Sequence, residues 1–167
     1  IASFLAAGCV VALNIAARDA DAEARRLATV ALGRLAREDA GRKEMIAQAS
    51  VPALAKCAVD ENVDVRRAAF EAVACLAVTL EGLRACHEAD FVTVTVGRCT
   101  EQGGEPDPAV QLAALSALHQ LCKNDPGARE AIECGAIEMC VGVLEHGTDD
   151  MREQAGYCLT VLTVEQA

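Results

Sequence analysis

The stretches EARRLATVALGRLA (Glu23–Ala36) and DVRRAAFEAVACLA (Asp64–Ala77) decide the fold, because they superimpose at an offset of 41 residues. Their Arg-Arg pairs coincide at this offset. A further 45 residues bring Leu76 onto Leu121, and another 41 bring Leu121 onto Leu162. A unit that recurs about every 40 residues is typical of stacked helical repeats. We therefore predict four units, at 1–39, 40–80, 81–125 and 126–167.

The longest predicted helix of each unit carries buried-size residues at i, i+3, i+4 and i+7, which form one face of an amphipathic helix. The first two positions hold small residues and the fourth holds leucine, so neighbouring helices can approach closely without aromatic side chains. We expect a short first helix, a medium second helix and a long third helix in every unit. The stripe consists of Ala28, Ala31, Leu32 and Leu35, of Ala69, Ala72, Val73 and Leu76, of Ala114, Ala117, Leu118 and Leu121, and of Ala155, Cys158, Leu159 and Leu162.

Capping residues mark the predicted helix boundaries. Asp107-Pro108 and Asp125-Pro126 each predict an N-cap followed by proline at the first helical position. Gly8 and Gly135 occupy equivalent places at the turn between the two shorter helices, where positive φ favours glycine. The four extra residues of the third unit are placed in the turn-rich stretch Glu101–Asp107, before its long helix.

The stretch FVTVTVGRC (Phe91–Cys99) has a local preference that opposes the repeat. Its alternating β-branched residues favour a strand. The repeat register requires a second helix at this place, and an isolated strand would have no pairing partner. We therefore predict a helix.

Composition limits the partners that the surface can bind. The chain contains 34 alanines, only 2% aromatic residues, and a formal net charge of −10. A protein that binds nucleic acid over its whole surface would carry the opposite charge, so we expect no nucleic acid partner. A local basic stripe on this acidic body stays open.

The nine cysteines include no pair with CxxC spacing, and most stand where alanine or leucine would be expected. A disulfide framework or a zinc site needs clustering that is absent from the sequence. We predict free, buried thiols in a reducing, cytoplasmic setting, and no bound metal.

Catalytic motifs are absent from the sequence. His87, His119 and His146 lie in three different predicted elements, and none belongs to an HExxH pattern. Adjacent helical side chains point about 100° apart, so Cys86 and His87 form no catalytic couple. We predict structural histidines in a protein that is not an enzyme and has no cofactor or small-molecule substrate.

The two ends of the chain are apolar. Residues 1–17 carry no charge, but they are too short and too interrupted to span a membrane, and they lack the basic region of a targeting signal. Residues 1–8 and 161–164 lack the polar surface that a terminal solenoid repeat needs. We therefore expect a piece of a longer solenoid, or a chain whose ends dock on a partner.

The four units resemble the armadillo repeat over the whole chain. The best copy is EAIECGAIEMCVGVLEHGTDDMREQAGYCLTVL (Glu130–Leu162), in which a Gly-Ala-Ile turn separates the two shorter helices. The resemblance implies an all-α, right-handed α-solenoid of about four three-helix repeats. A HEAT-like solenoid is the alternative.

In peptide-binding armadillo proteins such as importin-α and β-catenin, an Asn on the third helix holds the backbone of an extended peptide, and a Trp one turn earlier lines the same groove. Neither residue is kept in this chain. The register puts Arg34, Cys75, Gln120 and Val161 at the Asn position, and Val30, Glu71, Ser116 and Tyr157 at the Trp position.

The resemblance also implies that positions i, i+4 and i+8 of the third helices line a concave, protein-binding face. This face would be basic at its N-terminal end and mildly apolar at the other, which suits an acidic or mixed helix or extended segment. The alternative is that Arg26 and Arg67 only pair with acids of their own helices. The predicted residues are Arg26, Val30, Arg34, Arg67, Glu71, Cys75, Ser116, Gln120, Glu153 and Tyr157, with Leu112 and Val161 at the remaining positions.

Residues 63–86, VDVRRAAFEAVACLAVTLEGLRAC, are similar to repeats of the armadillo-type radial-spoke proteins of motile cilia. This resemblance implies a non-catalytic protein–protein interaction scaffold, in a ciliary or axonemal assembly such as the radial spoke. The alternative is a peptide-binding adaptor or transport receptor that uses the groove. In both cases the expected partners are other proteins, and neither membranes nor nucleic acid.

Overall fold

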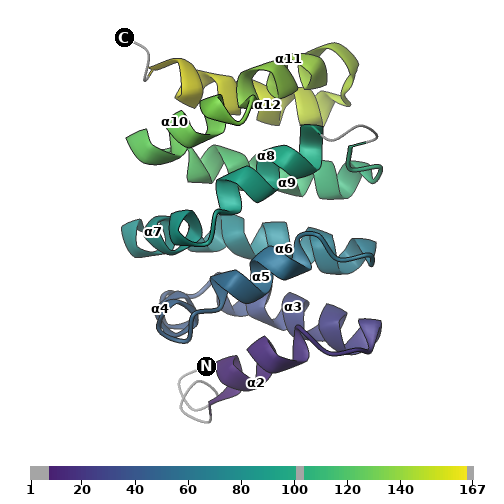
Figure 1. The fold of residues 1–167 in the computed structure, drawn as a ribbon, viewed down its shortest axis with the longest axis vertical. Helices are drawn as coiled ribbons and strands as arrows, with labels where there is room; N and C mark the ends of the chain where they lie inside the picture. Colours follow the sequence, from purple (N-terminus) through teal and green to yellow (C-terminus); the bar gives the residue numbers. More distant parts are fainter. Residues whose placement is uncertain (1–7, 101–103, 165–167) are drawn as a thin grey trace.

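The computed structural model describes residues 8–100 and 104–164, and this part of the chain forms eleven α-helices and no strand. The helices are stacked along the long axis of the molecule, from α2 at one end to α12 at the other (Figure 1). The predicted all-helical solenoid is therefore confirmed. The helices are α2 (Cys9–Ala16), α3 (Ala22–Leu35), α4 (Asp39–Ala47), α5 (Val51–Cys57), α6 (Val63–Leu76), α7 (Leu80–Glu88), α8 (Phe91–Thr100), α9 (Pro108–Leu121), α10 (Asp125–Glu133), α11 (Ala136–His146) and α12 (Asp149–Val164).

The helices fall into three columns. The long helices pack in order, α3 on α6, α6 on α9 and α9 on α12. Helices α2, α5, α8 and α11 lie across this layer, and α4, α7 and α10 lie along one edge (Figure 1). Two expectations fall outside the described residues, namely a first helix over residues 1–7 and part of the loop, residues 101–103.

Two local predictions were wrong. In the second unit the first helix has nine residues and the second has seven, so the expected order of lengths is reversed. The second error concerns the cap of α10, which is Asn124 rather than Asp125. Asn124 has the extended backbone of an N-cap and accepts a hydrogen bond from the Gly127 N–H at 3.1 Å. Asp125 therefore stands in the first turn, where its charge favours the positive end of the helix. The cap predicted at Asp107, with Pro108 as first helical residue, is confirmed.

The stretch Phe91–Cys99, whose residues favour a strand, is helical, as the repeat register predicts. Four of its side chains are buried, and the Thr95 hydroxyl donates a hydrogen bond to the Phe91 carbonyl oxygen at 2.7 Å. The Phe91 ring contacts Phe70 of α6 edge to face, with ring centres 5.9 Å apart. Burial against α6 outweighs the modest cost of β-branched residues in a helix.

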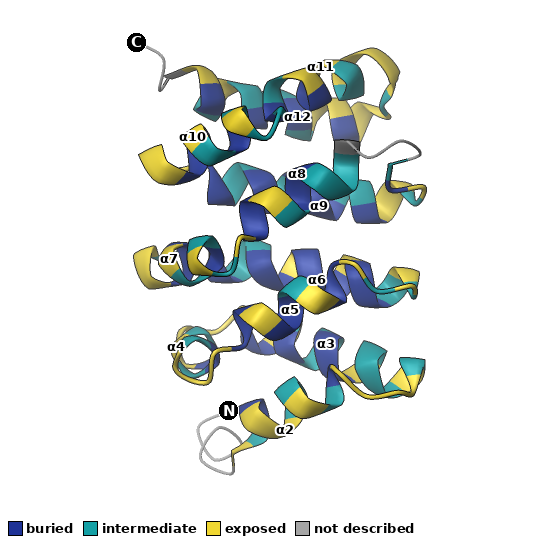
Figure 2. Ribbon diagram, viewed as in Figure 1, coloured by how far each residue is buried: buried dark blue, intermediate teal, exposed yellow. Residues whose placement is uncertain are grey.

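The core runs without interruption along the stack (Figure 2). Every residue of the predicted apolar stripe is buried except Ala31 in α3 and Leu159 in α12, which are part-buried. Small residues at the first two stripe positions place the long helices close together, so packing is efficient without large side chains. The two exceptions lie in the first and last long helices.

Glycine recurs where the edge helices α4, α7 and α10 meet the carboxyl ends of the preceding long helices. At each junction a Cβ on the glycine would lie about 2 Å from the carbonyl oxygen of the last leucine in the long helix. Only glycine permits this approach. The contacts join Gly41 to Leu35, Gly82 to Leu76 and Gly127 to Leu121.

The turn before each second helix uses a left-handed backbone conformation. Gly8 and Gly135 have φ values of 71° and 86°, which confirms the prediction. The equivalent residues of the middle units are Ala49 and Asp90, with φ values of 49° and 53°. Aspartate tolerates this conformation better than alanine does, because its side chain can hydrogen-bond locally. Ala49 is therefore strained.

Replacing Ala49 with glycine is expected to raise the free energy of unfolding by about 1 kcal/mol, because glycine carries no penalty at positive φ. Gly135→Ala is expected to lower it by a similar amount. Urea denaturation followed by circular dichroism measures both. An Ala49→Gly variant that is no more stable than the wild type would contradict the assignment of strain to this turn.

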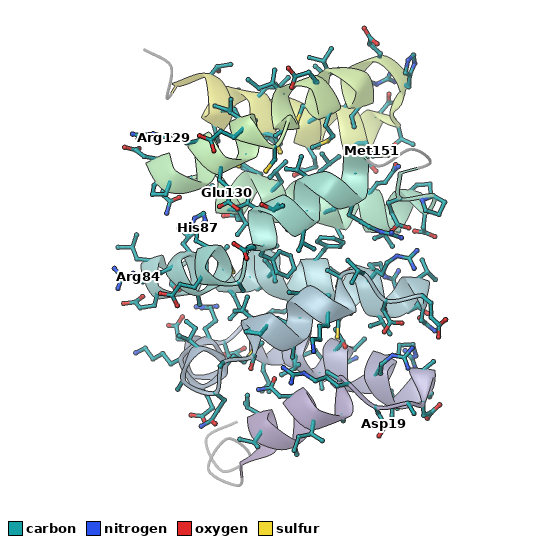
Figure 3. The ribbon with its side chains drawn as sticks, in the orientation of Figure 1. Asp19, Arg84, His87, Arg129, Glu130 and Met151 are labelled. Atoms are coloured by element: carbon teal, nitrogen blue, oxygen red, sulfur yellow. The ribbon has the colours of Figure 1, made fainter. Side chains whose placement is uncertain are left out.

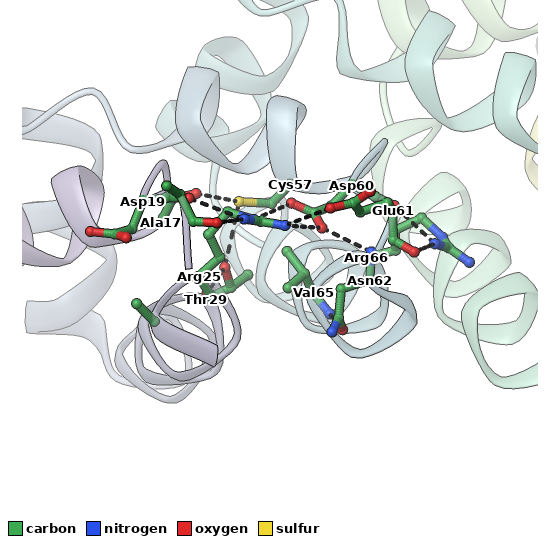
Figure 4. A network of polar contacts seen from close by, with 12 residues as sticks. Ala17, Asp19, Arg25, Thr29, Cys57, Asp60, Glu61, Asn62, Val65 and Arg66 are labelled. Carbon is green, nitrogen blue, oxygen red and sulfur yellow. Dashed lines mark hydrogen bonds and ion pairs between the residues drawn. The ribbon is translucent and has the colours of Figure 1, made fainter. Parts of the chain in front are cut away.

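Arginine side chains tie neighbouring units together (Figure 4). Arg25 in α3 binds both carboxylate oxygens of Asp60, at 2.7 and 3.0 Å, and also donates to the Asp19 and Ala20 carbonyls. Arg66 in α6 binds both oxygens of Glu105, each at 2.7 Å, and donates to the Asp60 and Glu61 carbonyls. Each arginine is the fourth residue of its long helix. We call each pair an inter-unit clamp.

Backbone hydrogen bonds hold the carboxylates of the clamp acids in place. Asp19, Asp60 and Glu105 each stand two residues before the cap of a long helix, and a carboxylate oxygen of each accepts a hydrogen bond from the backbone N–H two residues later. Burial raises the pKa of Asp60 and of Glu105, but the hydrogen bonds from arginine and backbone outweigh burial and hold each pKa below its ordinary value. Both acids are therefore ionised at neutral pH.

Candidate functional site

An open cleft of about 670 Å³ runs over the long helices α3, α6 and α9. Three of its lining residues are arginines, Arg34, Arg37 and Arg67, and one is an acid, Glu71. The floor consists of small residues, which leave room between the helices. The other lining residues are Val30, Gly33, Ala68, Ala74, Cys75, Ala109, Leu112, Ala113 and Ser116.

The cleft contains the local basic surface that composition left open. Arg34 and Arg37 are exposed and form no ion pair among the described residues. Arg67 lies 3.0 Å from Asp64 and 4.0 Å from Glu71, in contacts within one exposed helix face. Such exposed pairs contribute at most about 1 kcal/mol and exchange readily for another acid. Among the described residues, one cleft of this acidic protein thus holds two arginines without an ion pair and one arginine in weak, exposed ion pairs.

Six of the ten predicted protein-binding residues line this cleft, namely Val30, Arg34, Arg67, Glu71, Cys75 and Ser116. The structure does not bring the other four into it. Arg26 is bound by Glu23 of its own helix, at 2.7 and 2.6 Å. Arg26 and Arg67 therefore each pair with an acid of their own helix, which is the alternative to a binding role.

The remaining three predicted residues belong to the C-terminal units. The Gln120 side chain accepts a hydrogen bond from Lys123 Nζ at 2.8 Å, so its amide oxygen is already engaged. The Tyr157 hydroxyl donates to Glu153 at 2.8 Å, and its ring stacks on His119 with ring centres 5.7 Å apart. These residues lie on α9 and α12 and are not among the residues that line the cleft.

Sequence reasoning missed Arg37 and the small floor residues. Arg37 follows the helix end at Leu35, so a rule that counts positions within one helix does not reach it. Two floor residues, Gly33 and Ala74, each lie three residues after one predicted position of the long helix and one residue before the next. Extending the helical spacing by one further turn from Arg34 would have found Arg37.

The described residues contain no group of three or more His, Cys, Asp or Glu side chains placed to hold a metal ion. All nine cysteines lie within the described ranges and are free thiols. Burial raises the pKa of the Cys86 and Cys122 thiols to about 12, so neither is ionised at neutral pH. In the part of the chain that the structure covers, no helix is long and apolar enough to cross a membrane.

His87 is the histidine with the most contacts. Its ring nitrogens lie 3.2 Å from a carboxylate oxygen of Glu130 and 3.2 Å from the side-chain oxygen of Asn124. Figure 3 shows His87 and Glu130 on successive edge helices, between Arg84 and Arg129. The histidine thus joins α7 to α10, in agreement with the predicted structural role.

No family model matches the sequence, and no curated protein matches it. Solved structures do match. A crystal structure of an engineered protein has a TM-score of 0.88 and 23% identity; the match covers 96% of this chain and 65% of that one. A designed armadillo repeat protein in complex with the peptide (KR)4 has a TM-score of 0.85 and 20% identity; the match covers 99% of this chain and 73% of that one. A further designed armadillo repeat protein has a TM-score of 0.87 and 20% identity, with 97% and 68% covered.

These similarities extend over nearly the whole chain, but the identities are low, so they establish the fold alone. The chain spans about two thirds of the length of the engineered protein that it matches. Together with the repeat period, the three columns of helices and the left-handed turns, they show that this chain has the armadillo-like repeat fold.

Proposed function

We propose that this chain is a protein-interaction scaffold that binds an acidic, extended segment of a partner protein in the cleft over α3, α6 and α9. The observation that carries the proposal is a pair of exposed arginines, Arg34 and Arg37, which form no ion pair within the described part of a chain of net charge −10. Arg67 adds a third cation whose present partners are exposed and replaceable. Charge complementarity of this kind selects partners and speeds association.

The geometry of the cleft suits an extended chain better than a compact ligand. It crosses three successive long helices and is open along its length, with a floor of alanine and glycine. A partner backbone can therefore approach closely while its acidic side chains reach the arginines. The designed armadillo repeat protein with similar fold is a complex with (KR)4, a basic peptide. The cleft described above is itself basic, with three arginines and one acid, so the proposed partner is acidic rather than basic.

A labelled (ED)4 peptide tests the proposal by fluorescence polarisation, with (KR)4 as the oppositely charged control. We expect (ED)4 to bind the wild-type chain and (KR)4 not to bind. The double variant Arg34→Glu, Arg37→Glu is expected to weaken the affinity for (ED)4 about 100-fold, because each reversal places like charges together.

The matched control is Arg84→Glu, Arg129→Glu, which makes the same change of charge on the edge helices α7 and α10 (Figure 3). Charges more than about 8 Å away are screened at physiological salt, so the control should change the affinity no more than about three-fold. Equal losses in both double variants, or no binding of (ED)4 by the wild type, would overturn the proposal.

The ciliary setting stays a prediction that rests on residues 63–86 alone, which form α6 and the first part of α7. The cytoplasmic setting likewise stays a prediction, based on the free cysteines. A transport-receptor role is disfavoured by the residues at the Asn position, because Arg34 and Cys75 cannot supply the amide and Gln120 is bound by Lys123.

A further inference from the structure

Two arginines of the cleft stand side by side where α3 ends. The Arg37 N–H donates a hydrogen bond to the Arg34 carbonyl oxygen at 3.4 Å, and Ala36 between them has a φ of −62° and a ψ of −18°. This is the geometry of a 3₁₀ turn, in which side chains three residues apart lie one above the other. Both side chains are exposed and line the same cleft. Their guanidinium groups can therefore bind one ligand together.

A third arginine lies close to this pair, because α3 and α6 approach each other there. A Cβ on Gly33 would lie 3.7 Å from the Ala68 carbonyl oxygen and 3.8 Å from the Ala72 Cβ. Arg34 follows Gly33 in the chain and Arg67 precedes Ala68, and both arginines line the cleft. Arginines from two successive long helices thus border the same part of the cleft.

The charge of the cleft matches that of a phosphate group. Three arginines and one glutamate line it, which leaves a net charge of +2. A phosphoserine carries about −1.5 to −2 at pH 7 and offers three acceptor oxygens. Like charges one turn apart repel each other, as those of Arg34 and Arg37 do. A single dianion that reaches both arginines relieves this repulsion more fully than a carboxylate bound to one of them.

The number of acceptor oxygens also favours phosphate over carboxylate at this pair. One guanidinium fork can occupy both oxygens of a carboxylate, whereas a phosphate has a third oxygen for a second fork. Glu71, the acid among the lining residues, lies 4.0 Å from Arg67 and lowers the positive charge there. The pair Arg34 and Arg37 is therefore the more cationic end of the cleft.

We propose that the cleft binds a phosphorylated serine or threonine of the partner segment, with the phosphate held between Arg34 and Arg37. This inference rests on the proposed function, because the phosphorylated residue is part of the acidic segment that the cleft binds. Arg67 then binds a carboxylate of the same segment. Phosphorylation of the partner would control its binding to this chain.

Three labelled peptides with blocked termini test the proposal by fluorescence polarisation. They are EAGpSGAE, its unphosphorylated form EAGSGAE, and EAEGEAE, in which glutamates replace the charge of the phosphate. At about pH 7.5 the first and third peptides carry nearly the same charge, about −4. We expect the phosphopeptide to bind the wild-type chain at least about ten-fold more tightly than the glutamate peptide, and the unphosphorylated peptide to bind most weakly.

The double variant Arg34→Lys, Arg37→Lys separates geometry from charge, because lysine keeps each positive charge but lacks the planar fork. We expect the preference for the phosphopeptide over the glutamate peptide to fall to about two-fold, while the affinity for the glutamate peptide changes no more than about three-fold. The matched control is Arg84→Lys, Arg129→Lys on the exposed edge helices, which should leave both affinities unchanged (Figure 3). Circular dichroism should show that both double variants stay folded.

The outcomes distinguish this inference from the function on which it rests. If the glutamate peptide binds as tightly as the phosphopeptide, or if the lysine variant keeps the full preference, the phosphate site is overturned and the acidic-segment scaffold stands. If neither acidic peptide binds the wild-type chain, the proposed function falls together with the phosphate site.

Discussion

Replacing Glu105 with glutamine is expected to lower the free energy of unfolding by about 3 to 5 kcal/mol at neutral pH, because it leaves the buried Arg66 charge without its counter-ion. The Glu105 side chain is fully buried and the Arg66 side chain is 6% exposed. Arg98 also lies 3.1 Å from the same carboxylate, so two cations lose their partner. Urea denaturation measures the loss.

The pH dependence of this effect follows from the pKa of Glu105. Its pKa in the folded state lies below the ordinary value of 4.5, since hydrogen bonds from Arg66 and from backbone outweigh the opposing effect of burial. The stabilisation is therefore complete above about pH 4.5 and is lost as the pH falls through the lower folded-state pKa. The difference between wild type and Glu105→Gln should narrow over that acid range.

The control for Glu105 is Glu71→Gln, which removes an exposed acid at 4.0 Å from Arg67. It should change the free energy of unfolding by less than about 0.5 kcal/mol. The double variant Arg66→Met, Glu105→Gln should recover part of the loss, because the uncompensated charge is then removed. If Glu105→Gln costs no more than Glu71→Gln, the clamp does not hold the units together.

Replacing Gly82 with alanine is expected to lower the free energy of unfolding by about 3 kcal/mol, because the new methyl group meets backbone that cannot move away. A Cβ on Gly82 would lie 1.9 Å from the Leu76 carbonyl oxygen and 2.7 Å from its carbon. Relieving this overlap requires α7 to shift away from the end of α6, and the packing of Leu83 and Cys86 on the core would be disturbed.

The control for Gly82 is Gly142→Ala in α11, where the new Cβ has no neighbour within 4 Å. Alanine is the better helix former by about 0.5 to 1 kcal/mol, so this variant should be slightly more stable than the wild type. Both substitutions replace glycine with alanine. Opposite changes in the free energy of unfolding, measured by urea denaturation, would therefore show that the close contact with Leu76 causes the loss at Gly82. A Gly82→Ala variant as stable as Gly142→Ala would show that the edge helices are free to shift.

The recurrence of Arg25 and Arg66 at the repeat offset was visible in the sequence, but the role of these arginines was not. The same holds for the acids Asp60 and Glu105, which share one place before the caps. Spacing along a helix indicates which face a residue occupies, and Arg25 and Arg26 differ by only one position. Stacking decided that Arg25 reaches an acid 35 residues later, whereas Arg26 pairs within its own helix.

The cleft was predicted in part for a similar reason. Val30, Arg34, Glu71 and Cys75 follow from helical spacing, because the long helices pack side by side in register. Arg37 was not predicted, because it lies after the end of α3 at Leu35 and so outside the positions that were counted within the helix. Tyr157 was predicted by the same spacing, but it stacks on His119 instead.

The sequence by itself determined the period, the three-helix unit and the buried stripe, because apolar spacing and repeat offset are properties of the chain that neighbouring units cannot alter. Only the tertiary structure decided the rest. Phe91–Thr100 is a helix despite its strand preference because burial against α6 is worth more than local propensity. The ends of the stack expose residues whose inner counterparts are buried, since burial depends on the layer above and below and no single repeat contains that information.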